Sequence, residues 1–238
     1  MDQIWVKEKQ IMRFDHCDAF ALAIPKNASE SIHAALAYTW PNGKQHRVHD
    51  HKLLKDILLE GDDFTRTHYC IAIVREPVER FVSAWWYLQW NTGILERQKW
   101  NPEENRPGTH QYLNNLETTL TLLEQKVKHN ADELSVEQYW RQFYDLDYVF
   151  HPQWTYCATT DGVIPDYLHF YNIKGIVEAW PELINKFIYG EWSPKPFPKE
   201  NSTPLELKKT VEETLTTEQI QRVTAIYEKD YRLFSKYF

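Results

Sequence analysis

The chain lacks an excess of basic residues: among its 238 residues, 34 aspartates and glutamates outnumber 27 lysines and arginines. The resulting formal charge of −7 argues against a general nucleic-acid binder, because binding to a phosphate backbone needs a broad basic face. We therefore expect no nucleic-acid partner, and any basic site must be local.

Cysteines are few, and long apolar runs are absent. Cys17, Cys70 and Cys157 lack the short spacings of zinc sites and redox pairs, so we expect free, buried thiols in a reducing compartment. No apolar run reaches 18 residues, and the first ten residues carry charges where a signal peptide has its apolar core. These features predict a soluble, cytoplasmic protein with no membrane partner.

The chain does contain enough apolar and aromatic material for a folded core. Hydrophobic residues make up 42% of it and aromatic residues 15%, which argues against long disorder. The sequence has no internal repeat and no long linker, so we predict a single domain over residues 1–238. Helical patterns at 112–129 and 135–144 predict a largely helical insert at about 101–145.

Short apolar runs predict the strands of a buried parallel sheet. They lie at 20–24, 68–74, 149–157 and 167–170. Helices are predicted at 29–40, 52–60, 76–90, 182–189 and 217–238. Pro181 marks the first position of the fourth of these helices. The alternation predicts an α/β fold with a central parallel sheet flanked by helices.

A candidate anion-binding turn separates the first predicted strand from its helix. A helix start offers unpaired N–H groups and the positive end of the dipole, which attract phosphate or sulfate. Lys26 adds a mobile charge, Ser29 and Ser31 can donate hydroxyl hydrogen bonds, and Ala28 lets the backbone approach closely. The segment lacks the Gly-Lys-Ser/Thr sequence of an ATP-type P-loop, and an ordinary turn is the alternative reading.

The same layout recurs between the second predicted strand and its helix. Arg75 ends the strand as a bidentate donor, and Pro77 opens the helix. Ser83 lies two turns further on, where its hydroxyl can join Arg75 on one phosphate. The alternative pairs Arg75 with Glu79 and leaves Arg80 and Ser83 on a solvated face. Two anion sites in this order indicate a nucleotide with phosphates at both ends.

Together these motifs resemble those of the sulfotransferases that use 3′-phosphoadenosine 5′-phosphosulfate, especially the carbohydrate branch with heparan sulfate 2-O-sulfotransferase and its bacterial relatives. The sequence Pro-Lys-Asn-Ala-Ser-Glu-Ser at 25–31 is similar to the family's 5′-phosphosulfate loop, and 75–83 is similar to its 3′-phosphate motif. Weaker similarities lie at 151–153, 201–202 and 227–234. The resemblance covers most of the chain and implies a P-loop-like three-layer sandwich.

The resemblance implies that both motifs hold the donor nucleotide, through Lys26, Asn27, Ala28, Ser29, Glu30, Ser31, Arg75 and Ser83, with Asn201 from the weaker similarity. Lys199, in the proline-rich loop at 191–204, can close over the nucleotide, although a lysine in an exposed loop is usually only solubilising. Glu30 stands where the family usually has threonine, and a carboxylate beside a phosphosulfate is repelled unless it points away. A second reading therefore stays open, namely a non-catalytic binder of adenosine 3′,5′-bisphosphate-type nucleotides.

The implied reaction moves a sulfuryl group to a hydroxyl of a sugar or small metabolite, with no metal required. Lys26 and the loop amides suit the charge on the leaving phosphate. The resemblance points to a His-x-His as the source of the base, and we favour His51 over His49. Alternatively, these histidines lie on the surface or bind an adventitious metal. Trp86 and Trp90 share a helix face and are candidates for stacking on the acceptor.

Overall fold

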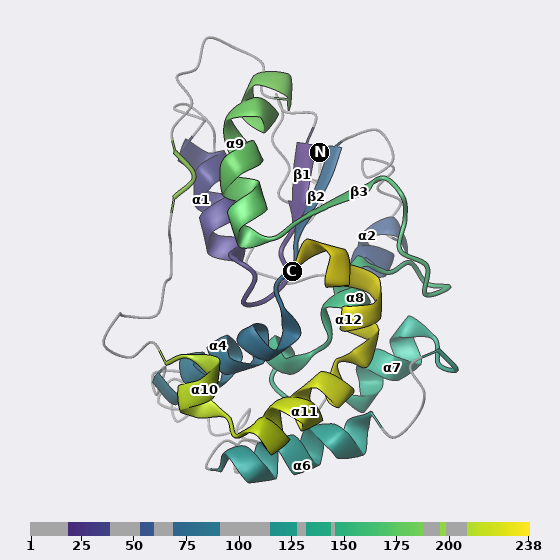
Figure 1. Cartoon of the computed structure of the whole chain (residues 1–238). Helices are drawn as coiled ribbons and strands as arrows, with labels where there is room; N and C mark the ends of the chain where they lie inside the picture. The colour runs from purple at the N-terminus through teal and green to yellow at the C-terminus, as the bar shows by residue number, and fades with distance from the viewer. Residues whose placement is uncertain are drawn as a thin grey trace, which may run out of the picture.

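The computed structural model describes residues 19–38, 53–59, 69–90, 115–127, 132–143, 146–187, 196–198 and 209–238. Its strands β1 (Ala19–Leu22), β2 (Tyr69–Ile73) and β3 (Leu168–Tyr171) form a parallel sheet in the order β1-β2-β3 (Figure 1). Parallel neighbours need crossover connections, and helices supply them here. The predicted α/β fold with a parallel sheet is confirmed for this part of the chain.

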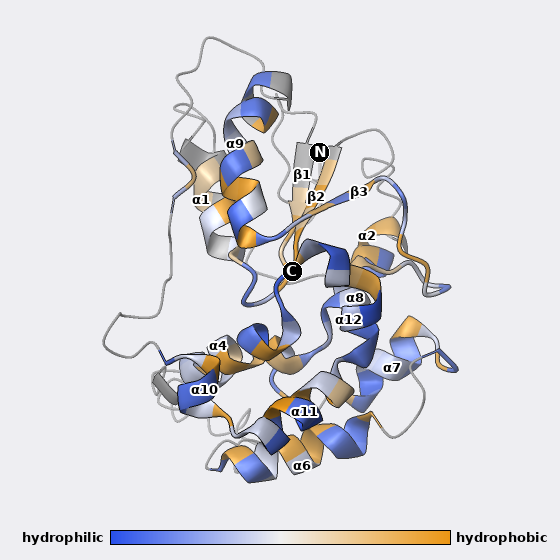
Figure 2. Cartoon of the chain, viewed as in Figure 1, coloured by the Kyte–Doolittle hydropathy of each residue, from blue (hydrophilic) through white to orange (hydrophobic). Residues whose placement is uncertain are grey.

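Helices cover both faces of the sheet because the strands are apolar on both sides. Successive side chains of a strand point to opposite faces. Ile71 and Ile73 pack with α1 (Ser29–Tyr38) and α9 (Ile173–Phe187), which lie together beside the sheet (Figure 1). Cys70 and Ala72 belong to the larger cluster on the other face. Of the strands, β2 is accordingly apolar along most of its length, between more mixed helices (Figure 2).

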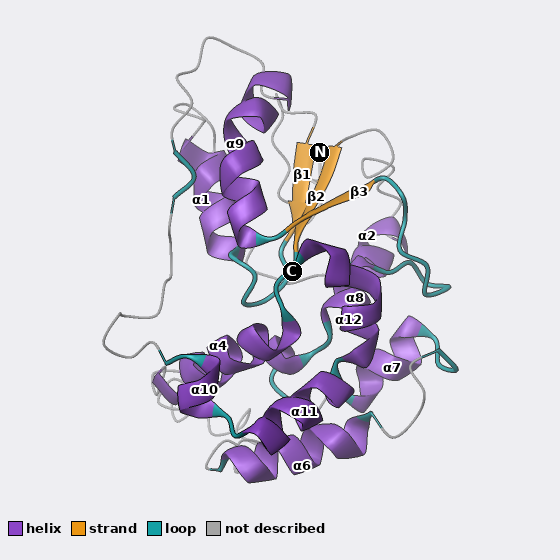
Figure 3. Cartoon of the chain, viewed as in Figure 1, coloured by secondary structure: helices purple, strands orange, loops and turns teal. Residues whose placement is uncertain are grey.

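The other described helices contribute to the larger cluster or pack against it. They are α2 (Leu54–Leu59), α4 (Pro77–Trp90), α6 (Leu116–Lys126), α7 (Val136–Gln142), α8 (Gln153–Cys157), α10 (Val211–Thr214), α11 (Thr217–Ile226) and α12 (Glu228–Phe234). Two short 3₁₀ turns, η2 (Tyr148–Phe150) and η4 (Ser235–Tyr237), complete this set. Figure 3 shows α4, α6, α10 and α11 beyond the ends of the strands. Side-chain caps define several of the starts, such as the reciprocal capping boxes of Ser135 with Gln138 and of Thr216 with Gln219.

The strand predicted at 149–157 is wrong, because this segment forms η2 and α8. Every side chain of α8 is buried, so no polar face reveals the helical period in the sequence. A short, fully buried apolar run does not distinguish a strand from a helix. The Asp147 side chain accepts a hydrogen bond from the amide of Val149 at 3.1 Å, which favours the turn that starts η2.

The sequence predicted that Pro181 opens a helix. This prediction is wrong, because Pro181 lies inside α9. A proline in a helix interior removes one hydrogen bond and clashes with the preceding turn. Trp180 and Leu183 are buried on either side of it, and Ile176 is buried one turn earlier. Packing of this apolar stripe against the sheet offsets the local cost. The helix predicted at 217–238 is also divided, with Tyr227 as the C-cap of α11 and the N-cap of α12.

Cys70 and Cys157 are buried thiols outside any disulfide, as predicted, whereas Cys17 lies outside the described residues. Burial raises the pKa of the Cys70 thiol to about 12 and also raises the pKa of Cys157. Both therefore behave as structural thiols. None of the helices in the described ranges is both long and apolar enough to cross a membrane.

Candidate anion-binding site

The two predicted anion motifs meet at one edge of the sheet. Strands β1 and β2 run parallel in register, with Leu22 opposite Ala72. Residues 23–28 leave β1 and lead into α1, and residues 74–76 leave β2 and lead into α4. Because neighbouring parallel strands are about 4.8 Å apart, the two turns lie side by side at the carboxyl ends of the strands. In α/β sheets this edge is the usual place for a ligand.

The first turn has an unusual backbone. Lys26 and Ala28 adopt left-handed conformations, with φ values of 64° and 57°. Such a conformation costs a non-glycine residue about 1–3 kcal/mol, so the surroundings must hold it. Asn27, between them, is 1% exposed, and its Nδ2 donates to the carbonyl oxygen of Ile73 at 2.8 Å. The side chain of Asn27 therefore ties the first turn to the end of β2.

Lys26 points across the edge toward the second motif. Its Nζ lies 3.9 Å from the centre of the Tyr87 ring on α4. Burial, together with the positive charges of Arg75 and Arg80, lowers the pKa of Lys26 to about 8, while Asp147 acts in the opposite direction. A cation whose pKa is lowered by other cations gains most from the arrival of an anion.

Two arginines of the second motif add to this positive charge. Arg75 is partly buried, and its Nε lies 3.4 Å from Oε2 of the exposed Glu79, so the predicted pairing exists at the limit of hydrogen-bond length. The reading of Arg80 as a solvated residue is wrong, because it is 1% exposed. Its Nε donates to the carbonyl oxygen of Pro25 at 3.1 Å, and within the described ranges its Nη2 has no hydrogen-bond partner. Arg80 thus joins α4 to the first turn.

The remaining predicted binding residues differ in their exposure. Ala28 and Ser29 are half-buried, whereas Ser31 is buried. Ser83 is half-buried on α4. Several predicted site residues lie outside the described residues, in whole or for the side chain only: His49, His51, Lys199 and Asn201, the side chain of Glu30, and the side chain of Trp90.

Trp86, a candidate for stacking on the acceptor, is held by the protein itself. Its Nε1 donates to the Thr214 hydroxyl on α10 at 2.9 Å, and its ring packs against the larger core cluster. This indole therefore joins α4 to α10. Its role toward an acceptor stays a prediction.

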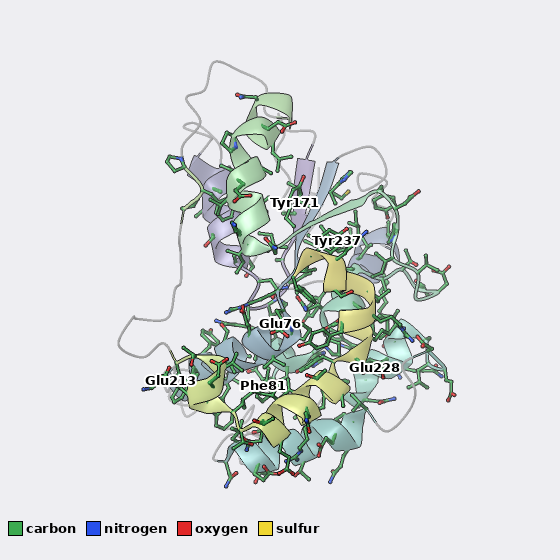
Figure 4. All side chains as sticks on the ribbon, viewed as in Figure 1. Glu76, Phe81, Tyr171, Glu213, Glu228 and Tyr237 are labelled. Carbon is green, nitrogen blue, oxygen red and sulfur yellow. The ribbon has the colours of Figure 1, made fainter. Side chains whose placement is uncertain are left out.

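The C-terminal helix α12 supports the second turn, which the sequence indicated only as a weak similarity at 227–234. Oε2 of Glu76 accepts a hydrogen bond from the Glu79 amide at 2.7 Å and so caps the start of α4. Its Oε1 accepts from the Tyr231 hydroxyl of α12. Figure 4 shows Glu76 between α4 and the C-terminal helices. Burial is the largest influence on Glu76 and raises its pKa.

Asp230 of α12 caps α8 from a fully buried position. Its two carboxylate oxygens accept from the amides of Gln153 and Trp154 at 2.9 Å and 2.8 Å. Desolvation raises the pKa of Asp230 to about 6, and the charge of Arg80 opposes that shift. The carboxylate is thus a buried link between the end of the chain and residues beside the two turns.

Asp230 is expected to make stability depend on pH. A carboxyl whose folded pKa exceeds its ordinary value of 3.8 stabilises the fold most below that value, and this contribution is lost as pH rises through about 6. Between pH 4 and pH 6, the unfolding free energy of the wild type should fall relative to Asp230→Asn, by at most about 1.4 kcal/mol per pH unit. Denaturant titrations of both proteins at pH 4, 5, 6 and 7 test this. Parallel stability curves would contradict it.

The pKa of Lys26 predicts a pH dependence of anion binding. As pH rises through about 8, the free protein loses the Lys26 charge, and affinity for adenosine 3′,5′-bisphosphate should fall about tenfold per pH unit. The phosphates themselves are fully ionised there. Calorimetric titrations from pH 7 to pH 9.5 measure the slope. Lys26→Arg is the control, because a guanidinium stays charged and should give a flat profile. An equal slope in both proteins would assign the titration to another group.

Two strand–turn–helix units that share a positively charged edge are typical of α/β proteins that bind phosphate esters. No cluster of histidine, cysteine or acidic side chains suited to a metal is found in the described ranges. A family model described as the sulfotransferase family matches residues 9–237, and the chain belongs to this family. Comparisons with curated proteins and with solved structures gave no match. The sulfotransferase resemblance is confirmed at the level of the family.

Proposed function

We propose that the protein is a sulfotransferase that uses 3′-phosphoadenosine 5′-phosphosulfate as its donor, in a single domain with a P-loop-like sandwich. The supporting observation is the convergence of three cations, Lys26, Arg75 and Arg80, on the edge where two turns leave parallel strands. Lys26 and Arg75 serve as ligands in this proposal, whereas Arg80 supports the first turn. A donor with a 5′-phosphosulfate and a 3′-phosphate carries anions for both turns.

Each turn has a separate task. The first turn and the start of α1 bind the 5′-phosphosulfate through backbone amides and the hydroxyls of Ser29 and Ser31. Lys26 lies beside the oxygen that bridges phosphorus and sulfur. Arg75 and Ser83 bind the 3′-phosphate, since Arg75 ends the turn after β2 and Ser83 is half-buried on α4, the helix that this turn opens. Glu30 lies in the first turn of α1, where a carboxylate that points away from the anion suits the helix dipole.

In the transfer step, the acceptor oxygen attacks sulfur, and the bond between sulfur and the bridging oxygen breaks. The electron pair of that bond moves to the 5′-phosphate, where the Lys26 ammonium stabilises the new charge. The acceptor proton passes to a base, for which we propose His51, with His49 as the alternative. No metal takes part in this scheme. Lys199 and Asn201 are proposed to complete the nucleotide site.

The proposed acceptor is a hydroxyl of a carbohydrate or a small metabolite, in keeping with the resemblance of 25–31 and 75–83 to the carbohydrate branch. Incubation with the phosphosulfate donor and a panel of sugars and small alcohols tests this. Release of adenosine 3′,5′-bisphosphate that depends on acceptor and protein supports the transferase. Tight binding of the bisphosphate without turnover on any acceptor would instead favour the non-catalytic binder.

A further inference from the structure

We propose that Gln153 is a positioning residue that holds the two anion-binding turns at a fixed separation, so that one nucleotide can engage both at once. The proposal deepens the proposed function and rests on it. Gln153 lies at the start of α8, far from both motifs in the sequence, and its side chain reaches the end of each turn.

The Gln153 carboxamide makes three contacts with the two turns. Its Oε1 accepts from the backbone amide of Arg75 at 2.9 Å, and its Nε2 donates to the carbonyl oxygen of Arg75 at 2.8 Å. The same Oε1 accepts from Nδ2 of Asn27. The backbone of Arg75 is thus held from both sides, and the first turn is held by the same oxygen. One carboxamide joins the two motifs directly.

Gln153 is itself fixed in place. It is fully buried, and its backbone amide donates to Asp230, which also caps the next residue of α8. Asn27 is buried as well and donates to the end of β2. Gln153 and Asn27 are both buried, so an alternative arrangement would leave the groups that now bond to their side chains without partners in the interior. The network therefore sets one spacing between the turns, and Arg80 reinforces it through Pro25.

A fixed spacing matters because the two phosphates of one nucleotide are a fixed distance apart. When both turns are correctly placed, binding of one phosphate to its turn gives the other phosphate a high effective concentration at the second turn. When the spacing varies, each turn still binds its own anion, but simultaneous binding is penalised. Affinity for the bisphosphate should therefore fall, and affinity for either monophosphate should fall far less. A purely structural role would weaken all three ligands alike.

The test compares Gln153→Leu with Leu123→Ala. The first removes the three side-chain hydrogen bonds at similar volume. The second creates a cavity under α6, away from the site, and lowers stability without touching either turn. Calorimetry at pH 7 measures the affinity of each variant for adenosine 3′,5′-bisphosphate, adenosine 5′-phosphate and adenosine 3′-phosphate. We expect Gln153→Leu to lower the affinity for the bisphosphate about tenfold, as is typical for a change within one hydrogen-bond network. Its affinity for each monophosphate should fall less than twofold. Leu123→Ala should leave all three within twofold.

Hydrogen exchange provides a readout that needs no ligand. Gln153→Leu should speed amide exchange in peptides that cover 23–28 and 74–76 by at least about tenfold, beyond any change that Leu123→Ala causes there. Equal weakening of the three nucleotides, or equal exchange in the two variants, would overturn the positioning role. Failure of the wild type to bind the bisphosphate would overturn the proposed function, while the exchange data would still judge whether Gln153 holds the turns.

Discussion

Replacement of Lys26 by methionine should lower kcat at least about a hundredfold while the melting temperature changes little. Lys26 is the only mobile cation of the first turn, and loss of one group that stabilises developing negative charge typically costs a factor of 10²–10³. Methionine keeps the length of the side chain and its contact with the Tyr87 ring. Folding already disfavours the ammonium, as its pKa of about 8 shows, so removal of the charge should not destabilise the protein.

Two further variants give this experiment its controls. Lys236→Met also removes an ammonium that lies over an aromatic ring, here Tyr237 in η4, and should leave kcat unchanged. Lys26→Arg keeps a positive charge and should retain part of the activity. Rates are measured by release of adenosine 3′,5′-bisphosphate, and folding by thermal melting. Full turnover by a correctly folded Lys26→Met protein would rule out a role for this residue in the transfer step.

Replacement of Arg75 by alanine should lower the affinity for adenosine 3′,5′-bisphosphate about 10- to 100-fold and the affinity for adenosine 5′-phosphate less than threefold. Only the first ligand carries the 3′-phosphate that Arg75 is proposed to bind, and hydrogen bonds to charged groups contribute about 1.5–3 kcal/mol. The Glu79 pairing, at 3.4 Å and on an exposed carboxylate, is weak enough to yield to a phosphate.

Arg141→Ala is the matched control for this measurement. Arg141 also pairs with a glutamate four residues away in its helix, Glu137, but it is exposed and lies in α7 rather than at the edge of the sheet. Its removal should leave both affinities unchanged. Calorimetry on the two variants measures the ligands side by side. Equal weakening of the bisphosphate and the monophosphate by Arg75→Ala would show that Arg75 does not read the 3′-phosphate.

Local sequence patterns predicted the elements that position the site. The apolar runs at 20–24 and 68–74 match β1 and β2 within a few residues, and the helices that follow begin where a serine and a proline suggested. These predictions succeed because the strand, the turn and the helix start each leave a signal within about ten residues. Topology then brings the two motifs together, since parallel strands share one carboxyl edge.

The weak similarities at 151–153 and 227–234 marked the supporting segments, but their contacts could not be predicted, because those contacts join distant segments. Gln153 lies 126 positions from Asn27 and 78 from Arg75, and Asp230 lies 77 positions beyond Gln153. In the sequence, Gln153 belonged to a run that suggested a strand. The sequence also suggested a surface position for Arg80, because nothing local reveals its hydrogen bond to Pro25, 55 positions earlier. Buried polar contacts of this kind carry no periodic signal.

The most direct test of the central claim, that the two turns form one site for a nucleotide with phosphates at both ends, is calorimetric titration of the wild type. Adenosine 3′,5′-bisphosphate and ATP with Mg²⁺ are titrated separately at pH 7. Tight one-to-one binding of the bisphosphate with little response to ATP is the predicted result. Preference for ATP, or no binding of either nucleotide, would contradict the account.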